Sequence, residues 1–209
     1  MAIICPAVLS ENKEIFQSYF SVVSTFSKRI HLDIMDGSFT DSRSVDLIDV
    51  KWPNHYQIDI HLMVAEPMNY IDKLIDLHPH MVIIHNEANV HHMLFSAKLH
   101  ESDILSGLAL LQGTPVEYAK QIMHSFDHVL IFSGDLGHYG GSLDLSLLDK
   151  VKEVADYHPG VEIGWDGGVN SNNIRQVVEG GVDVVNVGSF ISESDNPKNA
   201  YDKLEGLLL

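Results

Sequence analysis

The chain of 209 residues has a single cysteine and no long apolar run. Because Cys5 has no second cysteine to pair with, an internal disulfide is excluded, and a reducing compartment is the simplest expectation. No apolar run reaches the roughly 18 residues needed to cross a bilayer. The first residues also lack the basic segment and apolar core of a signal peptide. We therefore expect a cytoplasmic protein that does not enter a membrane.

Basic residues are scarce: 13 lysines and arginines face 29 aspartates and glutamates, for a formal net charge of −16. A field of this sign repels nucleic acid and anionic membranes, which proteins usually engage through basic patches. We expect neither as a partner. The same field would repel an anionic substrate at long range, so a phosphate ligand would need backbone donors or a cation at its binding site.

What the sequence does contain is a series of eight short apolar segments, each followed by a stretch that we expect to be helical. Largely apolar strands that alternate with helices, at a spacing of about 20–30 residues, are typical of a parallel sheet covered on both sides. We predict an α/β fold, a single (β/α)8 TIM barrel that occupies residues 1–209. The expected strands are 3–9, 30–37, 56–63, 81–85, 106–111, 128–132, 161–165 and 182–187.

Residues 30–37 read Ile-His-Leu-Asp-Ile-Met-Asp-Gly and alternate in the manner of a strand. His31 and Asp33 point to the same side, and burying an unpaired imidazole or carboxylate is costly, so they need a partner. In a barrel, functional groups gather at the carboxyl ends of the strands, where His61 and Asp166 join this pair. Two imidazoles and two carboxylates suit a divalent cation such as Zn, Fe(II), Mn or Co. Alternatively, each is a structural polar group at a strand end.

Glycine-rich segments follow three of the expected strands: Gly140-Gly141-Ser142, Gly167-Gly168 and Gly188-Ser189. Bare backbone N–H groups at helix N-termini form an anion site, and the last two loops of such barrels commonly hold phosphate. Any one of these segments can be ordinary turn chemistry. Three of them on adjacent loops favour phosphate binding.

A cation and two carboxylates that face a phosphorylated ligand suggest proton abstraction next to a carbonyl. The cation would polarise the carbonyl oxygen and stabilise an enediolate. If Asp33 and Asp166 lie on opposite faces of that planar intermediate, one removes a proton and the other returns one on the far side. The carbon is then inverted, so the residues predict an epimerase.

These motifs resemble the ribulose-phosphate 3-epimerase family over nearly the whole chain. Residues 5–10, Cys-Pro-Ala-Val-Leu-Ser, resemble the N-terminal strand of the family, and residues 30–37 resemble its metal-binding strand. Residues 60–63 match its His-Leu-Met strand, and residues 166–169 match its late Asp-Gly-Gly turn. The combination of motifs is specific, whereas any one of them alone is not.

The resemblance implies metal-dependent epimerisation at C3, which interconverts D-ribulose 5-phosphate and D-xylulose 5-phosphate in the pentose phosphate pathway. It implies a metal held by His31, Asp33, His61 and Asp166, with Asp33 and Asp166 as the acid–base pair. His61 would also contact the substrate. We further expect a homo-oligomer whose small-molecule partner is a sugar phosphate.

Several positions depart from the family pattern in regions that touch the substrate. Met35 and Met63 would provide the apolar lining, but Phe132 stands where the family has a further methionine, and Ala7 where it commonly has a serine. Residues 135–141 read Asp-Leu-Gly-His-Tyr-Gly-Gly in place of Asn-Pro-Gly-Phe-Gly-Gly. Residues 38–42 likewise lack the usual Val-Pro-Asn. The reaction type is therefore better supported than the sugar, and another ketose phosphate, such as allulose 6-phosphate, stays open.

Two other functions compete with the epimerase. A phosphosugar decarboxylase or lyase of the orotidine-phosphate decarboxylase group would carry an Asp-x-Lys-x-x-Asp strand, but Met35 stands at the lysine position. A non-catalytic phosphosugar-binding barrel is compatible with the altered loops. His85, in the family-like sequence His-Asn-Glu-Ala, is either part of the pocket wall or a structural histidine.

Overall fold

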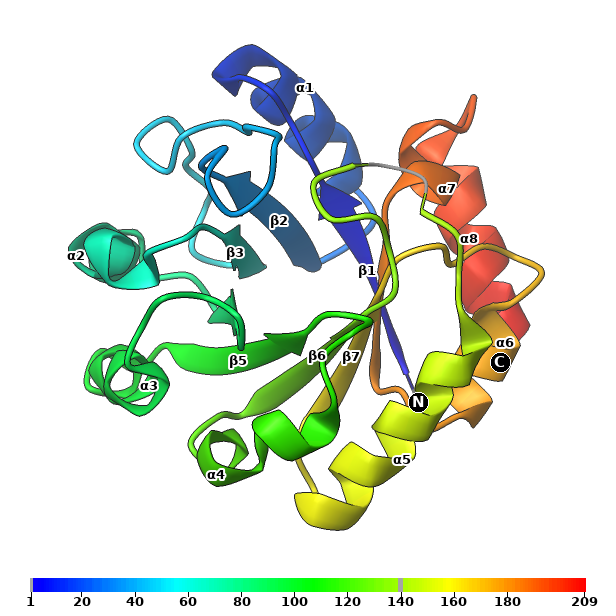
Figure 1. Cartoon of the computed structure of the whole chain (residues 1–209). Coiled ribbons are helices and arrows are strands. Elements are labelled where there is room, and N and C mark those ends of the chain that lie inside the picture. Colours follow the sequence, from blue (N-terminus) through cyan, green and yellow to red (C-terminus); the bar gives the residue numbers. More distant parts are fainter. Residues whose placement is uncertain (1, 139–140) are drawn as a thin grey trace.

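The computed structural model describes residues 2–138 and 141–209, and its strands form a closed parallel barrel. Each strand pairs with its neighbours in chain order, and β1 pairs with β8 to close the ring (Figure 1). The predicted (β/α)8 fold is therefore confirmed. The strands are β1 (Ile3–Val8), β2 (Arg29–Met35), β3 (Gln57–Met63), β4 (Met81–His85), β5 (Leu105–Leu110), β6 (His128–Phe132), β7 (Glu162–Asp166) and β8 (Val184–Val187).

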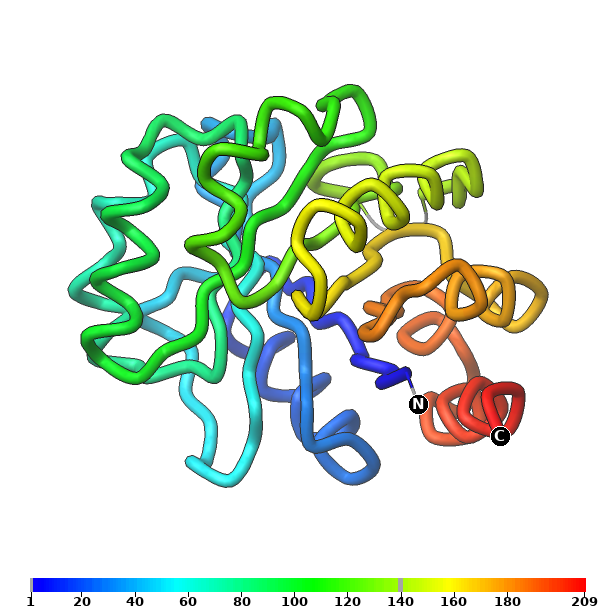
Figure 2. Tube along the Cα trace, turned by 90° about the horizontal axis from the view of Figure 1, so that it is seen from below, coloured from blue at the N-terminus to red at the C-terminus, as the bar shows by residue number. Residues whose placement is uncertain are grey.

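The helices surround the barrel, as both views of the chain show (Figures 1 and 2). No helix among the described residues is long and apolar enough to span a bilayer. The longer helices are α1 (Lys13–Val23), α2 (Ile71–Leu77), α3 (His92–His100), α5 (Leu148–Tyr157), α6 (Ile174–Glu179) and α8 (Pro197–Leu208). Shorter helical turns are η1 (Pro67–Tyr70), η2 (Val116–Tyr118), α4 (Lys120–Met123), η3 (Leu145–Leu147) and α7 (Ser189–Ser192).

The connection between β2 and β3 departs from the expected alternation because its described residues form no helix. Val45, Leu47 and Val50 are buried and join the main apolar core. The Asp46 carboxylate accepts a hydrogen bond from the backbone N–H of Ile48, which favours a turn over a helix at this point. Irregular chain therefore covers the outside of the barrel here.

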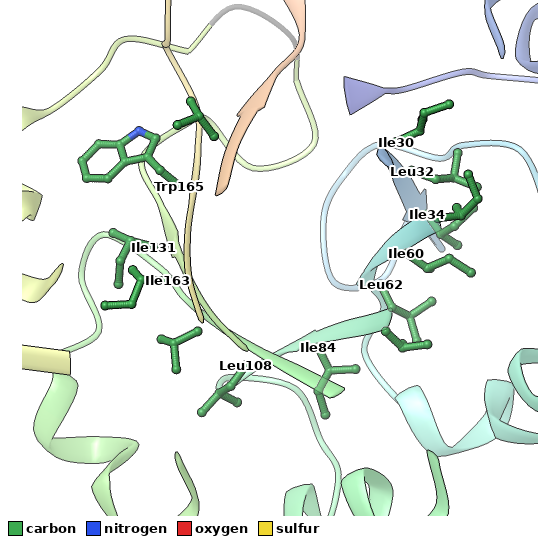
Figure 3. Close-up of a cluster of buried hydrophobic side chains, with 14 of the residues drawn as sticks. Ile30, Leu32, Ile34, Ile60, Leu62, Ile84, Leu108, Ile131, Ile163 and Trp165 are labelled. Atoms are coloured by element: carbon green, nitrogen blue, oxygen red, sulfur yellow. The ribbon is translucent and has the colours of Figure 1, made fainter. Parts of the chain in front are cut away.

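Side-chain alternation along β2 assigns its two faces. Ile30, Leu32 and Ile34 belong to the core between strands and helices, which Figure 3 shows around the strands. His31 and Asp33 lie on the opposite face, inside the barrel, where the His31 ring contacts the His61 ring of β3. An apolar cluster of Met81, Ile83, Ala109 and Leu130 fills the interior beside them.

A second polar group lies at the amino ends of the strands. The Arg29 guanidinium donates to Asp59 at 2.6 Å and to both carboxylate oxygens of Glu162 at 2.7 and 2.8 Å. His128 Nδ1 lies 2.8 Å from Glu162. Burial alone would raise the pKa of Glu162, but the hydrogen bonds from Arg29 and His128 lower it well below its usual range. This network closes the end of the barrel opposite the candidate site.

Candidate active site

Four predicted ligand residues converge at the carboxyl ends of three strands. His31 and Asp33 come from β2, His61 is the register partner of Asp33 on β3, and Asp166 ends β7. One nitrogen or oxygen atom from each lies within 4.8 Å of those of the other three. In the part of the chain that the structure describes, this is the group of side chains that could hold a metal ion.

The two carboxylates and the two imidazoles shift one another's protonation. Burial alone would lower the pKa of His31, but Asp166 and Asp33 raise it to about 10. The pKa of His61 is raised by the same two carboxylates against its burial. Conversely, burial would raise the pKa of Asp33 and Asp166, but His31 and His61 lower it. The cluster therefore stabilises positive charge between two ionised carboxylates.

The hydrogen bonding of His31 tests whether this donor set fits a cation. The imidazole is completely buried, yet neither ring nitrogen makes a hydrogen bond with a described residue. Its Nε2 lies 3.3 Å from Asp33 Oδ1 and 3.5 Å from Asp166 Oδ2, without hydrogen-bond geometry. A buried polar atom without a partner is costly, and a divalent cation bound by Nε2 and the two carboxylates would remove that cost for Nε2. The residues fit the predicted metal.

Above the cluster, a cavity opens to the surface, and Asp33 and Asp166 line it. Met63, Phe132 and Ala7 form part of its wall, whereas Met35 lines a neighbouring cavity. The predicted phosphate-binding residues that line the cavity are Gly141, Gly167, Gly168, Gly188 and Ser189. Two other residues predicted to contact the substrate, His61 and Ser142, are not among the lining residues, and Gly140 lies outside the described residues.

The turn after β7 depends on its two glycines. Gly167 and Gly168 have φ angles of +116° and +71°, a region that residues with a side chain rarely adopt. A Cβ on Gly167 would lie 2.2 Å from the backbone N of Gly134, and one on Gly168 would lie 2.2 Å from that of Leu143. Glycine therefore allows the loops after β6 and β7 to pack against each other around the cavity.

Asn186 on β8 also lines the cavity, although the sequence did not lead us to select it. It is the register partner of Asp166, and only 2% of its surface is exposed. Its Oδ1 atom has no hydrogen-bond partner among the described residues. The signal for Asn186 in the sequence is that it is the one polar residue of the strand Val184-Val185-Asn186-Val187. Its amide is a candidate contact for a polar ligand.

His85 at the end of β4 contacts the cluster from behind. It is completely buried, and its Nε2 lies 2.8 Å from Nε2 of His61. Burial lowers its pKa to about 4, so the imidazole is neutral near pH 7. His85 is therefore hydrogen-bonded to His61, one of the four candidate metal ligands, and is not among the described residues that line the cavity.

These features define a class: a (β/α)8 barrel with a buried His–Asp centre under a cavity ringed by glycine turns. The sequence matches the ribulose-phosphate 3 epimerase family over residues 3–192. The chain belongs to this family, so the predicted resemblance and the prediction of an epimerase are confirmed.

Curated relatives carry the same family name. A ribulose-phosphate 3-epimerase from Schizosaccharomyces pombe is 30% identical over 186 residues, which cover 86% of this chain and 82% of that protein. One from Helicobacter pylori J99 is 35% identical over 188 residues, or 85% of each chain. Among solved structures, 3-hexulose-6-phosphate synthase from Salmonella typhimurium superposes with a TM-score of 0.76. It is 13% identical and covers 99% of this chain and 98% of that one, a likeness of fold alone.

Proposed function

We propose that this protein inverts C3 of a ketose phosphate and thereby interconverts D-ribulose 5-phosphate and D-xylulose 5-phosphate. Membership of the family and its curated relatives support the reaction class. The observation that carries the proposal is that Asp33 and Asp166 share two imidazoles and both line the cavity. A two-base proton transfer requires two carboxyl groups at one site, one ionised to take a proton and the other protonated to return one.

Asp33 and Asp166 are the proposed acid–base pair, because they reach the cavity while His31 and His61 are completely buried. One aspartate, as the carboxylate, takes the proton from C3, while the other, as the carboxylic acid, delivers its proton to the opposite face of the planar enediolate. A cation such as Zn, Fe(II), Mn or Co, held by the four residues, would supply the positive charge that polarises the neighbouring carbonyl. The reverse reaction exchanges the roles of the two carboxylates, and the atoms balance because C3 loses one proton and gains one.

The phosphate group is proposed to bind at the glycine turns on the rim of the cavity. Gly167, Gly168 and Gly188 line it without side chains, and Ser189 begins the short helix α7. Backbone N–H groups in such turns attract anions locally, which the net charge of −16 makes necessary. The phosphate would therefore be held by the main chain of the loops that follow β7 and β8.

Ala7 and Phe132 on the cavity wall motivate a second sugar as an alternative substrate. A small residue at position 7 leaves room and removes a hydroxyl, so an epimerase of another ketose phosphate, such as allulose 6-phosphate, is the second candidate. A non-catalytic phosphosugar-binding barrel is the third, and it predicts binding without turnover.

One experiment separates these functions. The purified protein is analysed for metal and assayed with D-ribulose 5-phosphate, by coupling xylulose 5-phosphate formation to transketolase, and in parallel with allulose 6-phosphate. Asp33→Asn and Asp166→Asn serve as controls. The proposal is supported if the wild type turns over D-ribulose 5-phosphate and both variants lose this activity. Bound metal without turnover of either sugar contradicts the enzyme hypothesis.

The expected assembly and location are part of the same proposal. A homo-oligomer in the cytoplasm stays a prediction, which light scattering of the purified protein and fractionation of its natural host can test.

A further inference from the structure

His61 uses both ring nitrogens, and each faces a different group. Its Nδ1 lies 3.1 Å from Asp33 Oδ1 and 3.5 Å from Asp166 Oδ2. Its Nε2 lies 2.8 Å from Nε2 of His85. Two nitrogens at this distance form a hydrogen bond only if one carries a proton and the other presents its lone pair. The positions of the protons on His61 and His85 are therefore linked.

Glu87 lies at the other end of this pair. Its Oε2 is 3.5 Å from Nδ1 of His85, and its Oε1 accepts hydrogen bonds from the backbone N–H of Leu111, at 3.3 Å, and from the Thr114 hydroxyl. Nδ1 of His85 makes no hydrogen bond with a described residue, so Glu87 is a charged neighbour of that atom. Burial would raise the pKa of Glu87, but the nearby His85 and the hydrogen bond from Thr114 lower it. An ionised carboxylate can only accept hydrogen bonds. In the series Glu87, His85, His61, the Glu87 carboxylate therefore presents an acceptor to Nδ1 of His85.

We propose that His85 and Glu87 are positioning residues that fix the tautomer and orientation of His61 for metal binding. This inference rests on the proposed function, since it concerns the cation that the four residues would hold. If the four residues hold a cation, Nδ1 of His61 would supply a lone pair to it, and the His61 proton would lie on Nε2, from which it is donated to His85. His85 then carries its own proton on Nδ1, which faces Glu87. The proton on Nε2 of His61, the proton on Nδ1 of His85 and the negative charge of Glu87 are then mutually compatible.

The surroundings of His85 hold its ring in place for this role. The side chain is completely buried, with the Phe39 ring centred 4.9 Å away and the Phe132 ring 6.0 Å away. Nε2 of His92 lies 3.0 Å from the backbone oxygen of His85. A ring packed on several sides is restrained from turning, which keeps Nε2 of His85 facing Nε2 of His61.

The first test measures Co²⁺ affinity, by competition with a chelator, for the wild type and matched variants. His85→Leu removes the acceptor, and Glu87→Met removes the carboxylate at similar length. Changes in residues that orient a metal ligand typically weaken binding about 10- to 100-fold, and we expect this for both. His85→Gln keeps an acceptor and a donor, and we expect it to stay within about 3-fold of the wild type. Thr114→Val, which removes another partner of the same carboxylate, is the control.

The outcomes separate this inference from the proposed function. If the wild type binds Co²⁺ and His85→Leu and Glu87→Met bind it equally well, the positioning role is wrong while the proposed function stands. If the wild type binds no Co²⁺, the metal-dependent function fails and the positioning role fails with it. A Glu87→Met protein with wild-type circular dichroism and weakened binding supports the role even where His85→Leu does not fold.

The second test observes the protons directly in the wild-type protein. Long-range ¹H–¹⁵N spectra of the ¹⁵N-histidine-labelled wild-type protein, loaded with Zn²⁺, report which ring nitrogen carries the proton. We expect a proton on Nε2 of His61 and on Nδ1 of His85, with the His85 signals identified from the His85→Gln spectrum. A proton on Nε2 of His85 would overturn the proposal.

Discussion

Asp33 and Asp166, which come from opposite halves of the chain, share the same two imidazole nitrogens. Nδ1 of His61 lies 3.1 Å from Asp33 and 3.5 Å from Asp166, and Nε2 of His31 lies 3.3 and 3.5 Å from the same two oxygens. Two nearby carboxylates normally raise each other's pKa, but here the imidazoles lower the pKa of both. Each carboxylate is therefore available as a base.

The two-base mechanism predicts that each carboxylate acts on one epimer. Asp33→Asn and Asp166→Asn should each slow epimerisation by about 10²- to 10⁴-fold, the usual worth of a general acid or base. Each variant retains one base, so in D₂O it should exchange the C3 hydrogen of one epimer faster than it forms the other. Mass spectrometry of recovered sugar phosphate measures this. Near wild-type epimerisation by either variant, with normal metal content, contradicts the mechanism.

Removing the metal should abolish activity and lower thermal stability. His31, Asp33, His61 and Asp166 meet within 4.8 Å, so the loss of a cation leaves like charges and buried polar atoms facing one another. A cation present at 100 times its dissociation constant stabilises the folded state by about 2.7 kcal/mol. Dialysis against a chelator, followed by activity and thermal unfolding measurements with and without added Zn²⁺, Mn²⁺ or Co²⁺, tests this. Full activity in protein proven free of metal would sink the prediction.

Gly168→Ala should impair substrate binding. Its φ is +71°, and a Cβ would lie 2.2 Å from the backbone N of Leu143, so the turn must shift. Displacement of a binding loop by about 1 Å can cost up to about 100-fold, and we expect KM to rise at least about 10-fold. Gly160→Ala is the matched control, because Gly160 has a φ of +89° but nothing within 4 Å of its Cβ position. Equal kinetics for the two variants would exclude a role of the turn in binding.

Asn186→Leu tests whether the buried amide binds the substrate. If a sugar hydroxyl or carbonyl pairs with the amide, its loss should lower kcat/KM about 10-fold, the worth of one hydrogen bond. The variant should be at least as stable as the wild type, because Oδ1 has no partner among the described residues. Steady-state kinetics and urea unfolding measure the two effects. Unchanged kcat/KM for both sugars would remove Asn186 from the site.

Glu162→Gln should destabilise the protein in a pH-dependent way. Although burial opposes it, the hydrogen bonds from Arg29 and His128 lower the pKa of Glu162 below its unfolded value of about 4.3. The stabilisation is therefore present above pH 4.3 and lost as the pH falls below it. We expect a loss of about 2 kcal/mol at pH 7 that begins to shrink near about pH 5 and goes on shrinking as the pH falls toward the lowered pKa of Glu162 in the folded state. Urea unfolding at several pH values measures it, with the exposed Asp149→Asn as control, and a difference independent of pH would contradict it.

Several features of the site could be read from local sequence, whereas others could not. His31 and Asp33 were identifiable because alternation along one strand places them together, and Gly167-Gly168 because glycine pairs mark turns. The role of His85 was open, since its partner His61 lies on the neighbouring strand and their contact depends on register. Asn186 was passed over because a single polar residue in an apolar strand does not reveal what faces it.

The sequence by itself determined the fold class, the family and the residue types of the candidate metal centre. The fold class and the residue types follow from side-chain periodicity and strand-end positions, which are properties of short stretches of chain, and the family follows from the motifs that resemble it. Only the tertiary structure decided that four ligand atoms meet within 4.8 Å, that His85 lies behind His61, and that irregular chain replaces a helix between β2 and β3. Those contacts depend on strand register and barrel closure, which bring together residues far apart in the chain.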